Sequence, residues 1–237
     1  MKTISLIGYK GFVGSKISEE LSKNTNYNLV NLKRGDDISR AISSSDIVIH
    51  SANPAKRFFA NQNPELDYEE TVTKTYDFLQ KSINKKFILI SSISCRTQLD
   101  TNYGRNRKSC ELLVKQHPNF LILRLGPMFG KGRNQDVLHD ILNDRKIYIS
   151  ADTKYSYANV SWVVKKIVSL LDNNNQIIEI GSKNSISLND IKSHFKSKSI
   201  FKGFNDSQVA INNGDGPDVQ EVIDFAKTIM ISKKIIK

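Results

Sequence analysis

A serine and a tyrosine–arginine pair are the residues of this chain whose types and spacing best suit acid–base chemistry. Ser92 follows the apolar run 87–90, and Tyr103 opens a helix-like segment that also contains Arg107. The four-residue spacing puts Tyr103 and Arg107 on one face of a helix. A cation beside the ring stabilises a phenolate, so Tyr103 could serve as a general acid or base. Taken singly, Ser92 could be a loop residue and Tyr103 an aromatic at a helix start.

Three glycines near the start of the chain could hold the phosphates of a cofactor. Gly8, Gly11 and Gly14 follow the apolar run 4–7 and precede an amphipathic segment, 15–23. Glycine permits a tight turn, a close approach to phosphate and close packing of the helix on the strand. The helix N-terminus adds free N–H groups and a positive dipole end. This order predicts a dinucleotide site, whereas the alternative is a tight turn without ligand. The other residues expected at this loop are Lys10, Phe12 and Val13.

The end of the second predicted strand, 27–32, bears on which dinucleotide would bind. A carboxylate at this point favours NAD, and a basic group favours the 2′-phosphate of NADP. Lys33 and Arg34 stand here, and Lys10 of the glycine loop could reach the same phosphate. We therefore expect NADP rather than NAD, unless these charges only face solvent. Asp37 is expected to meet the adenine amino group.

Apolar strands and amphipathic helices alternate along the first 130 residues. This order is typical of a doubly wound parallel α/β sheet. Such sheets bind ligands at the carboxyl ends of their strands, where Ser51 and Ala52 are expected to contact the cofactor. His50, just before them, is expected to be a packed residue rather than a catalyst. Further expected strands are 46–50, 87–90 and 120–125, and expected helices are 65–81 and 103–118. The apolar positions expected in helix 65–81 are Leu66, Val72, Tyr76 and Leu79.

The pattern is looser after Gly132. Helices are expected at 135–143, 160–171 and 219–231, with another starting at 187–190. Strands are expected at 146–149 and 176–180, and a long surface loop at 203–217. We expect a dinucleotide-binding domain over 1–130 and, over 131–237, a reduced substrate-binding region that partly returns to the first domain.

Composition excludes several classes of protein. The 237 residues, 39% of them hydrophobic, fit one large domain or one domain with an appendage. The sequence has no signal-peptide pattern and no apolar run of the roughly 20 residues that a membrane helix needs, so we expect a cytoplasmic protein without a membrane partner. Cys95 and Cys110 have no metal-ligand spacing and are expected to be reduced, and no metal site is expected. The net charge of +11 suggests an anionic partner. The basic residues are scattered, which favours small phosphates over nucleic acid.

The motifs together resemble the extended short-chain dehydrogenase/reductases, the NAD(P)-dependent epimerase/dehydratase family that acts on nucleotide sugars. The glycine triplet, Val48–Ala52, Ile90–Ser92, Tyr103–Glu111 and Arg124–Gly132 are each similar to a family motif. The resemblance runs along nearly the whole chain. It implies a Rossmann-type fold with a small C-terminal substrate-binding region, and catalytic roles for Ser92, Tyr103 and Arg107. Homodimers paired through helices are common in the family, so a homodimer is expected.

The departures from the family pattern narrow the expected chemistry. Arg107 stands where the family has lysine; it keeps the charge but presents a planar fork in place of a compact ammonium. Ile93 and Ser94 stand where the family's 4,6-dehydratases carry Asp-Glu, so that elimination lacks its acid and base. We expect an NAD(P)H-dependent oxidoreductase that reduces a keto group of a nucleotide-linked sugar. The alternatives are an NAD-dependent nucleotide-sugar epimerase, or a non-catalytic NAD(P)-binding protein, which the arginine suggests.

Overall fold

The apolar runs of the first half of the chain form a parallel sheet. The computed structural model describes residues 1–235, and the chain divides into two compact units. Unit 1 comprises Met1–Leu125 with Val164–Ile178; unit 2 comprises Gly126–Val163 and the chain from Glu179 onward. Every predicted residue of the site lies in unit 1.

The sheet of unit 1 has the strand order β2-β1-β3-β4-β5-β9. Its strands are β1 (Lys2–Ile7), β2 (Tyr27–Leu32), β3 (Ile47–His50), β4 (Lys86–Ser92), β5 (Phe120–Leu125) and β9 (Gln176–Ile180), the last of which reaches into unit 2. The strands are parallel, which confirms the predicted doubly wound α/β sheet. The order reverses between β1 and β3, which is where open α/β sheets bind their ligands, beyond the carboxyl ends of the strands.

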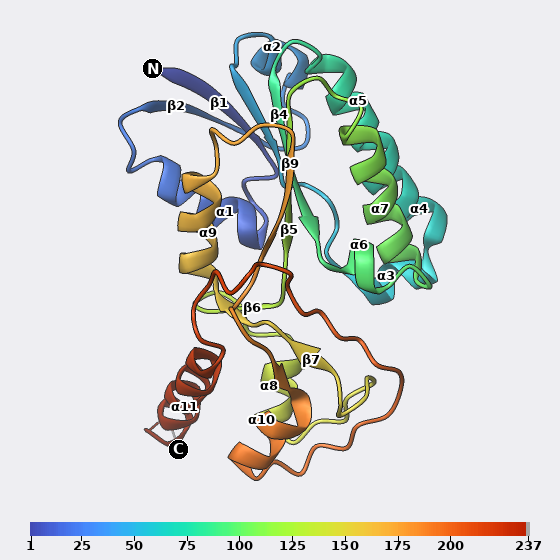
Figure 1. Cartoon of the computed structure of the whole chain (residues 1–237), viewed down its shortest axis with the longest axis vertical. Helices are drawn as coiled ribbons and strands as arrows, with labels where there is room; N and C mark the ends of the chain where they lie inside the picture. The colour runs from blue at the N-terminus through green and yellow to red at the C-terminus, as the bar shows by residue number, and fades with distance from the viewer. Residues whose placement is uncertain (236–237) are drawn as a thin grey trace. The chain divides into compact units, whose positions relative to one another are not determined.

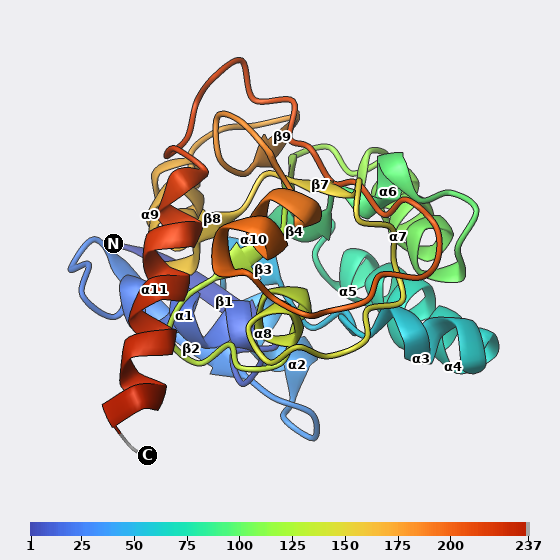
Figure 2. The same cartoon turned by 90° about the horizontal axis from the view of Figure 1, so that it is seen from below.

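Helices cover both faces of this sheet (Figure 1, Figure 2). Helix α1 (Phe12–Leu21) lies on one face, and α2 (Ile38–Ser43), α5 (Lys74–Lys81) and α7 (Asn102–Val114) lie on the other. Side chains of the latter three helices and of five strands pack into one core, including Ile42, Phe78, Phe87, Val114 and Ile122. The remaining helices of the unit are α3 (Arg57–Gln62), α4 (Pro64–Tyr68), α6 (Ser94–Thr97) and the part of α9 (Val160–Ser169) from Val164 on.

The predicted helix 65–81 is interrupted by a π-turn, η1 (Glu69–Thr73), between α4 and α5. A π-turn takes more residues per turn than an α-helix, so it rotates the faces before and after it relative to each other. Of the predicted apolar positions, Val72 and Leu79 are buried, but Leu66 and Tyr76 are 44% and 48% exposed. The prediction for these two was wrong because it assumed one uninterrupted 3.6-residue period.

Unit 2 is built from short elements around its own core. These are β6 (Met128–Phe129), α8 (Val137–Ile141), β7 (Lys154–Tyr155), β8 (Ala158–Asn159), β10 (Ile186–Ser187), α10 (Leu188–Phe195) and α11 (Gln220–Ile235). The predicted strand 146–149 was wrong: only Ile147 forms a bridge, to Phe201. Gly203 passes so close to this segment that a Cβ on it would lie 2.3 Å from the Tyr148 carbonyl oxygen. The β-bridge at Ile147 does not extend into a ladder of paired residues. Helix α10 begins where predicted, and Ser187 and Asp190 form a capping box at its start.

The described residues contain no helix with both the length and the apolar character to cross a membrane. Cys95 and Cys110 are buried and unbridged.

Candidate functional site

The glycine turn after β1 fits closely against the end of β3. Gly8 has φ +90°, and a Cβ on it would lie 2.7 Å from the Ala52 backbone. A Cβ on Gly14 would lie 2.2 Å from the Gly8 carbonyl oxygen and 2.6 Å from Ser51 Oγ. Both positions therefore require glycine. Four of the predicted cofactor residues, Gly8, Gly14, Ser51 and Ala52, thus come together at the carboxyl ends of β1 and β3.

Helix α1 begins beside this cradle without the usual means of satisfying its N-terminus. Gly11 is the N-cap, no side chain caps the helix, and its first turn has no acidic residue. Uncapped N–H groups and the dipole end favour an anion. Phe12 and Val13 occupy that first turn and are half-buried. The hydroxyl of Ser51, next to Gly14, is buried and has no hydrogen-bond partner within residues 1–235. The residues therefore fit a bound pyrophosphate.

The charged residues predicted to discriminate between NADP and NAD are more exposed than the glycines of the cradle. Lys10 and Lys33 are exposed, and neither ammonium forms an ion pair with another described residue. Arg34 is 81% exposed at its side chain and pairs with Glu70 at 2.7 Å. Asp37 caps α2 by accepting the Arg40 backbone N–H, so its carboxylate is engaged in the fold.

Ser92 is the last residue of β4 and lies at the carboxyl edge of the sheet. Its Oγ accepts the backbone N–H of Ser94 at 3.2 Å and donates to Ser94 Oγ at 3.1 Å. These bonds fix the Ser92 side chain at the point where the chain enters α6. If the Ser92 O–H turns from Ser94 Oγ toward a bound substrate, it can donate to a substrate oxygen at the strand end.

Tyr103 stands in the first turn of α7, which packs on α6. Thr101 caps α7 by accepting the Gly104 N–H at 3.0 Å. A Cβ on Gly104 would lie 2.0 Å from the Gln98 carbonyl oxygen, so glycine is needed for this close packing. The ring of Tyr103 is buried, at 7% exposure. Gly104 therefore brings the start of α7, with Tyr103, against the segment that follows Ser92.

Arg107 lies beneath Tyr103 on the same face of α7. Its guanidinium carbon is 4.9 Å from the centroid of the Tyr103 ring, a cation–π arrangement. Its Nη2 donates to the Pro54 carbonyl oxygen at 2.5 Å, and its buried Nε has no partner within residues 1–235. The predicted pairing of Tyr103 and Arg107 on one helix face is thus present. The guanidinium is also committed to the loop after β3, which the spacing alone did not indicate.

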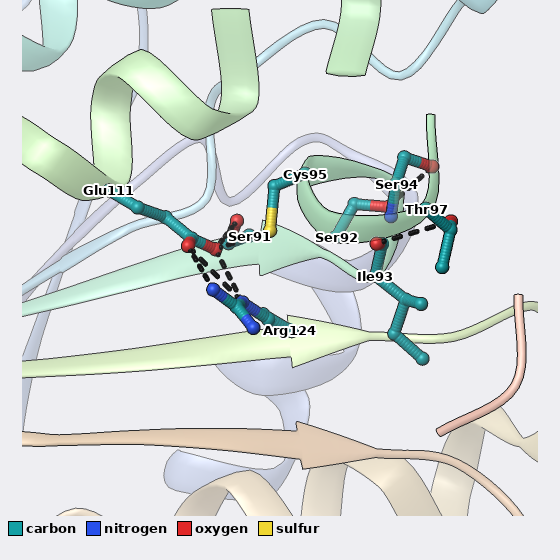
Figure 3. A network of polar contacts seen from close by, with 8 residues as sticks. All are labelled: Ser91, Ser92, Ile93, Ser94, Cys95, Thr97, Glu111 and Arg124. Atoms are coloured by element: carbon teal, nitrogen blue, oxygen red, sulfur yellow. Dashed lines mark hydrogen bonds and ion pairs between the residues drawn. The ribbon is translucent and has the colours of Figure 1, made fainter. Parts of the chain in front are cut away.

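A buried network centred on Glu111 ties α7 to β4, β5 and α6 (Figure 3). Glu111 is 1% exposed and accepts two hydrogen bonds from Arg124 Nε and one, of 2.6 Å, from Arg124 Nη2. It also accepts from Ser91 Oγ at 2.7 Å and from Cys95 Sγ at 2.9 Å. Burial and the Glu111 carboxylate raise the pKa of Cys95, so the thiol stays protonated and donates. The network holds the residues on both sides of Ser92.

His50 is a packed residue, as its place in an apolar strand suggested. Thr75 Oγ1 donates to the Thr71 carbonyl oxygen at 2.6 Å, so His50 Nε2, 3.0 Å away, donates to Thr75. His50 Nδ1 accepts the Ala52 N–H at 3.4 Å, which fits a neutral ring. Burial, and then the charge of Arg107, lower the pKa of His50 to about 3. The neutral ring thus holds the backbone of Ala52, against which Gly8 of the cradle packs.

Because His50 is buried in its neutral form, we expect the free energy of unfolding to fall as the pH falls. Below its usual pKa of 6.5 the unfolded chain binds a proton that the folded protein excludes until about pH 3, so stability falls as the pH falls through this range. Between pH 7 and pH 5 the loss should be about 2 kcal/mol. Urea unfolding of the wild type and His50→Gln at both pH values isolates this contribution, because other titrating groups cancel. Equal pH dependence in the two proteins would refute it.

Sequence reasoning gave no role to Gly104, Glu111 or Arg124, although all three lie in the quoted motifs. The sequence did contain an indication of Glu111 and Arg124. Each is a charged residue beside apolar residues, Arg124 in a predicted strand and Glu111 four residues after Arg107. Buried charges need partners, so two of opposite sign indicate a pair. The backbone carbonyl of Pro54 left no signal in the sequence.

Solved structures of known proteins share this fold. No protein-family model and no curated sequence matches the chain. Among solved structures, UDP-glucuronic acid 4-epimerase from Bacillus cereus, in complex with UDP-glucuronic acid and NAD, has a TM-score of 0.73 at 19% identity, over 95% of this chain and 93% of that one. The dTDP-4-dehydrorhamnose reductase from Bacillus anthracis, in complex with NADP, gives 0.74 at 17%, over 96% and 98%. TunA, an NAD-dependent NDP-hexosamine 5,6-dehydratase, gives 0.74 at 16%, over 95% and 91%. At these identities the likeness establishes the fold.

Proposed function

We propose that this chain is an extended short-chain dehydrogenase/reductase that uses a nicotinamide dinucleotide to reduce a keto group of a nucleotide-linked sugar. The observation that carries the proposal is the cradle of Gly8, Gly14, Ser51 and Ala52 at the same sheet edge as Ser92 and Tyr103. The glycine cradle suits a pyrophosphate, and the hydroxyls of Ser92 and Tyr103 suit a carbonyl oxygen. Solved structures with this fold that bind NAD or NADP support it.

The chain's own residues supply binding and proton transfer. A nicotinamide dinucleotide held in the glycine cradle would supply the hydride that the carbonyl carbon accepts. Ser92 Oγ–H donates to the carbonyl oxygen, and the Tyr103 hydroxyl gives that oxygen a proton, so the C=O becomes CH–OH and the tyrosine is left as phenolate. The positive charge of Arg107, against the ring face, stabilises this phenolate until solvent reprotonates it.

We propose that the cofactor is NADP. Asp37 is engaged as a helix cap, and Asp36 accepts the Lys33 backbone N–H at 2.9 Å, so the carboxylates near the end of β2 are held by the backbone. Lys10 and Lys33 present exposed ammonium groups without ion-pair partners in residues 1–235. A 2′-phosphate would supply their counter-charge.

Charge reversal at these lysines should therefore weaken NADPH selectively. We expect Lys10→Glu or Lys33→Glu to lower NADPH affinity about tenfold and to change NADH affinity less than twofold, because only NADPH carries the 2′-phosphate. Titration by calorimetry measures both. Lys81→Glu, at an exposed position of α5, is the matched control. Tighter wild-type binding of NADH than of NADPH would overturn the assignment.

The activity itself is tested by supplying NADPH and a set of nucleotide-linked 4-keto sugars. Oxidation of NADPH with stoichiometric hydroxyl product supports the reductase. Retention of NAD through purification, with no NADPH oxidation on any keto sugar, would instead favour an epimerase that recycles its cofactor.

A non-catalytic dinucleotide-binding protein is the second candidate, and the geometry of Arg107 favours it. The guanidinium is occupied by Pro54 and the Tyr103 ring, so it is less free than a lysine to bond a cofactor ribose. Turnover that Arg107→Lys increases and Tyr103→Phe abolishes would exclude this candidate. Cofactor binding with no reaction in any variant would establish it.

The homodimer expected from the family resemblance stays a prediction. Tyr68, Tyr76 and Leu112 are about half exposed on neighbouring helices of unit 1 and border one groove, which a second copy would cover. Light scattering on the wild type and Leu112→Arg tests it.

A further inference from the structure

A cavity of about 480 Å³ lies at the amino-terminal end of the sheet in unit 1. Lys2, Ile47 and Lys86, which line it, are the first residues of β1, β3 and β4. The glycine cradle and Ser92 stand at the opposite, carboxyl ends of these strands. The proposed reaction therefore has no use for this cavity.

Two of the lysines that line the cavity donate to neutral acceptors and not to a carboxylate. Lys86 is 8% exposed, and its Nζ donates to the Asn173 carbonyl oxygen at 2.7 Å and to Asn174 Oδ1 at 2.8 Å. Lys85 Nζ donates to the Ser43 carbonyl oxygen at 2.9 Å. Neither forms an ion pair within residues 1–235. An ammonium has three donors, so Lys86 retains one beyond its two neutral acceptors.

The two carboxylates that line the same cavity are engaged by other groups of the protein. Asp172 pairs with Lys2 at 2.8 Å, and Asp46 Oδ2 accepts the Thr3 backbone N–H at 2.7 Å. Burial lowers the pKa of Lys86, the Lys2 charge acts in the same direction, and the Asp172 charge opposes both. A buried charge is stable when it is paired, so the surroundings of Lys86 favour an external anion.

The rest of the lining describes the body that would accompany this anion. Asn119 Oδ1 is a buried acceptor with no partner within residues 1–235. Ile83, 54% exposed, and Pro118 give the cavity an apolar wall. A ligand with an anionic head, an apolar face and an N–H or O–H donor would satisfy all these groups.

We propose that this cavity binds a small phosphate monoester, with its phosphate between Lys85 and Lys86 and its organic body against Ile83 and Pro118. A phosphate dianion offers several acceptor oxygens, so it can use one donor from each lysine at once. The Asn119 oxygen would accept a hydroxyl or amine of the body. The site is independent of the dinucleotide cradle and of the proposed reaction.

Amide NMR with inorganic phosphate and with 4-aminophenyl phosphate tests the site by location. We expect both probes to shift the resonances of Ile47, Asn84 and Asn119 in the millimolar range, with the ester binding more tightly. Shifts confined to Gly8–Gly14, or no shifts, would overturn the proposal. Because the reporters are separate, this result does not depend on whether the reductase is correct.

Lysine variants then test the assignment. Lys86→Met should weaken phosphate binding about tenfold, and Lys81→Met, an exposed lysine outside the cavity, should leave it unchanged. Lys86 also holds the 173–174 turn. Lys85→Met, which removes an ammonium that donates to the Ser43 carbonyl oxygen, tests the pair without disturbing that turn. We expect it to weaken binding about threefold. Unchanged affinity in Lys85→Met, or in a folded Lys86→Met, would overturn the proposal.

Discussion

Tyr103→Phe should abolish keto-sugar reduction while leaving the fold and cofactor binding intact. The hydroxyl is the proposed proton donor, and loss of a general acid costs about 10²- to 10⁴-fold in turnover. The ring remains, so the stack with Arg107 remains as well. The hydroxyl has no hydrogen-bond partner within residues 1–235, so its removal leaves no orphaned group in the protein. Single-turnover NADPH oxidation, with thermal unfolding and NADPH titration alongside, measures each quantity.

The matched control is Tyr76→Phe, which removes the same hydroxyl from an exposed tyrosine of α5. Its turnover should equal that of the wild type. Ser92→Ala should lower turnover less than Tyr103→Phe, because it removes a hydrogen bond to the substrate and not the proton. A Tyr103→Phe protein that retains more than about a tenth of wild-type turnover would show that the proton comes from elsewhere.

The sheet and the glycine cradle could be predicted because their determinants are local. Strands β2, β5 and β9 coincide with apolar runs bounded by polar residues, and the predicted bounds were correct. Gly8 and Gly14 are required by close backbone contacts, and such contacts leave a glycine in the sequence. Parallel strands then bring Ser51 and Ala52 to the same edge, which follows from topology alone.

The rest depends on contacts between distant segments. The π-turn at 69–73 has no signature in the sequence, so Leu66 and Tyr76 were wrongly expected to be buried. Arg107 was correctly paired with Tyr103 by its spacing, but its bond to Pro54 joins residues 53 positions apart. The expected contact of Asp37 with the adenine amino group stays a prediction, and its role as the cap of α2 is the one that the structure shows.

Glu111→Gln should have the largest effect on stability, lowering the free energy of unfolding by about 3–5 kcal/mol. Glu111 is 1% exposed at its side chain, and its partner Arg124 is 13% exposed. The uncharged glutamine amide cannot neutralise the guanidinium of Arg124. Its NH₂ group would also face the groups that donate hydrogen bonds to Glu111 in the wild type. The buried charge of Arg124 then loses the counter-charge of Glu111. Urea unfolding at neutral pH, analysed by linear extrapolation, measures the loss.

Glu19→Gln on α1 is the control, because it removes an exposed carboxylate from an ion pair and leaves the buried network intact. Glu19 is 56% exposed and pairs with Lys16 at 2.8 Å, so its loss should cost less than about 1 kcal/mol. The Glu111 network also holds Ser91 and Cys95 on either side of Ser92, so Glu111→Gln should lower turnover even where the variant is fully folded. A loss of stability no larger than that of Glu19→Gln would show that the buried pair is dispensable, and that β4 and α6 hold Ser92 without it.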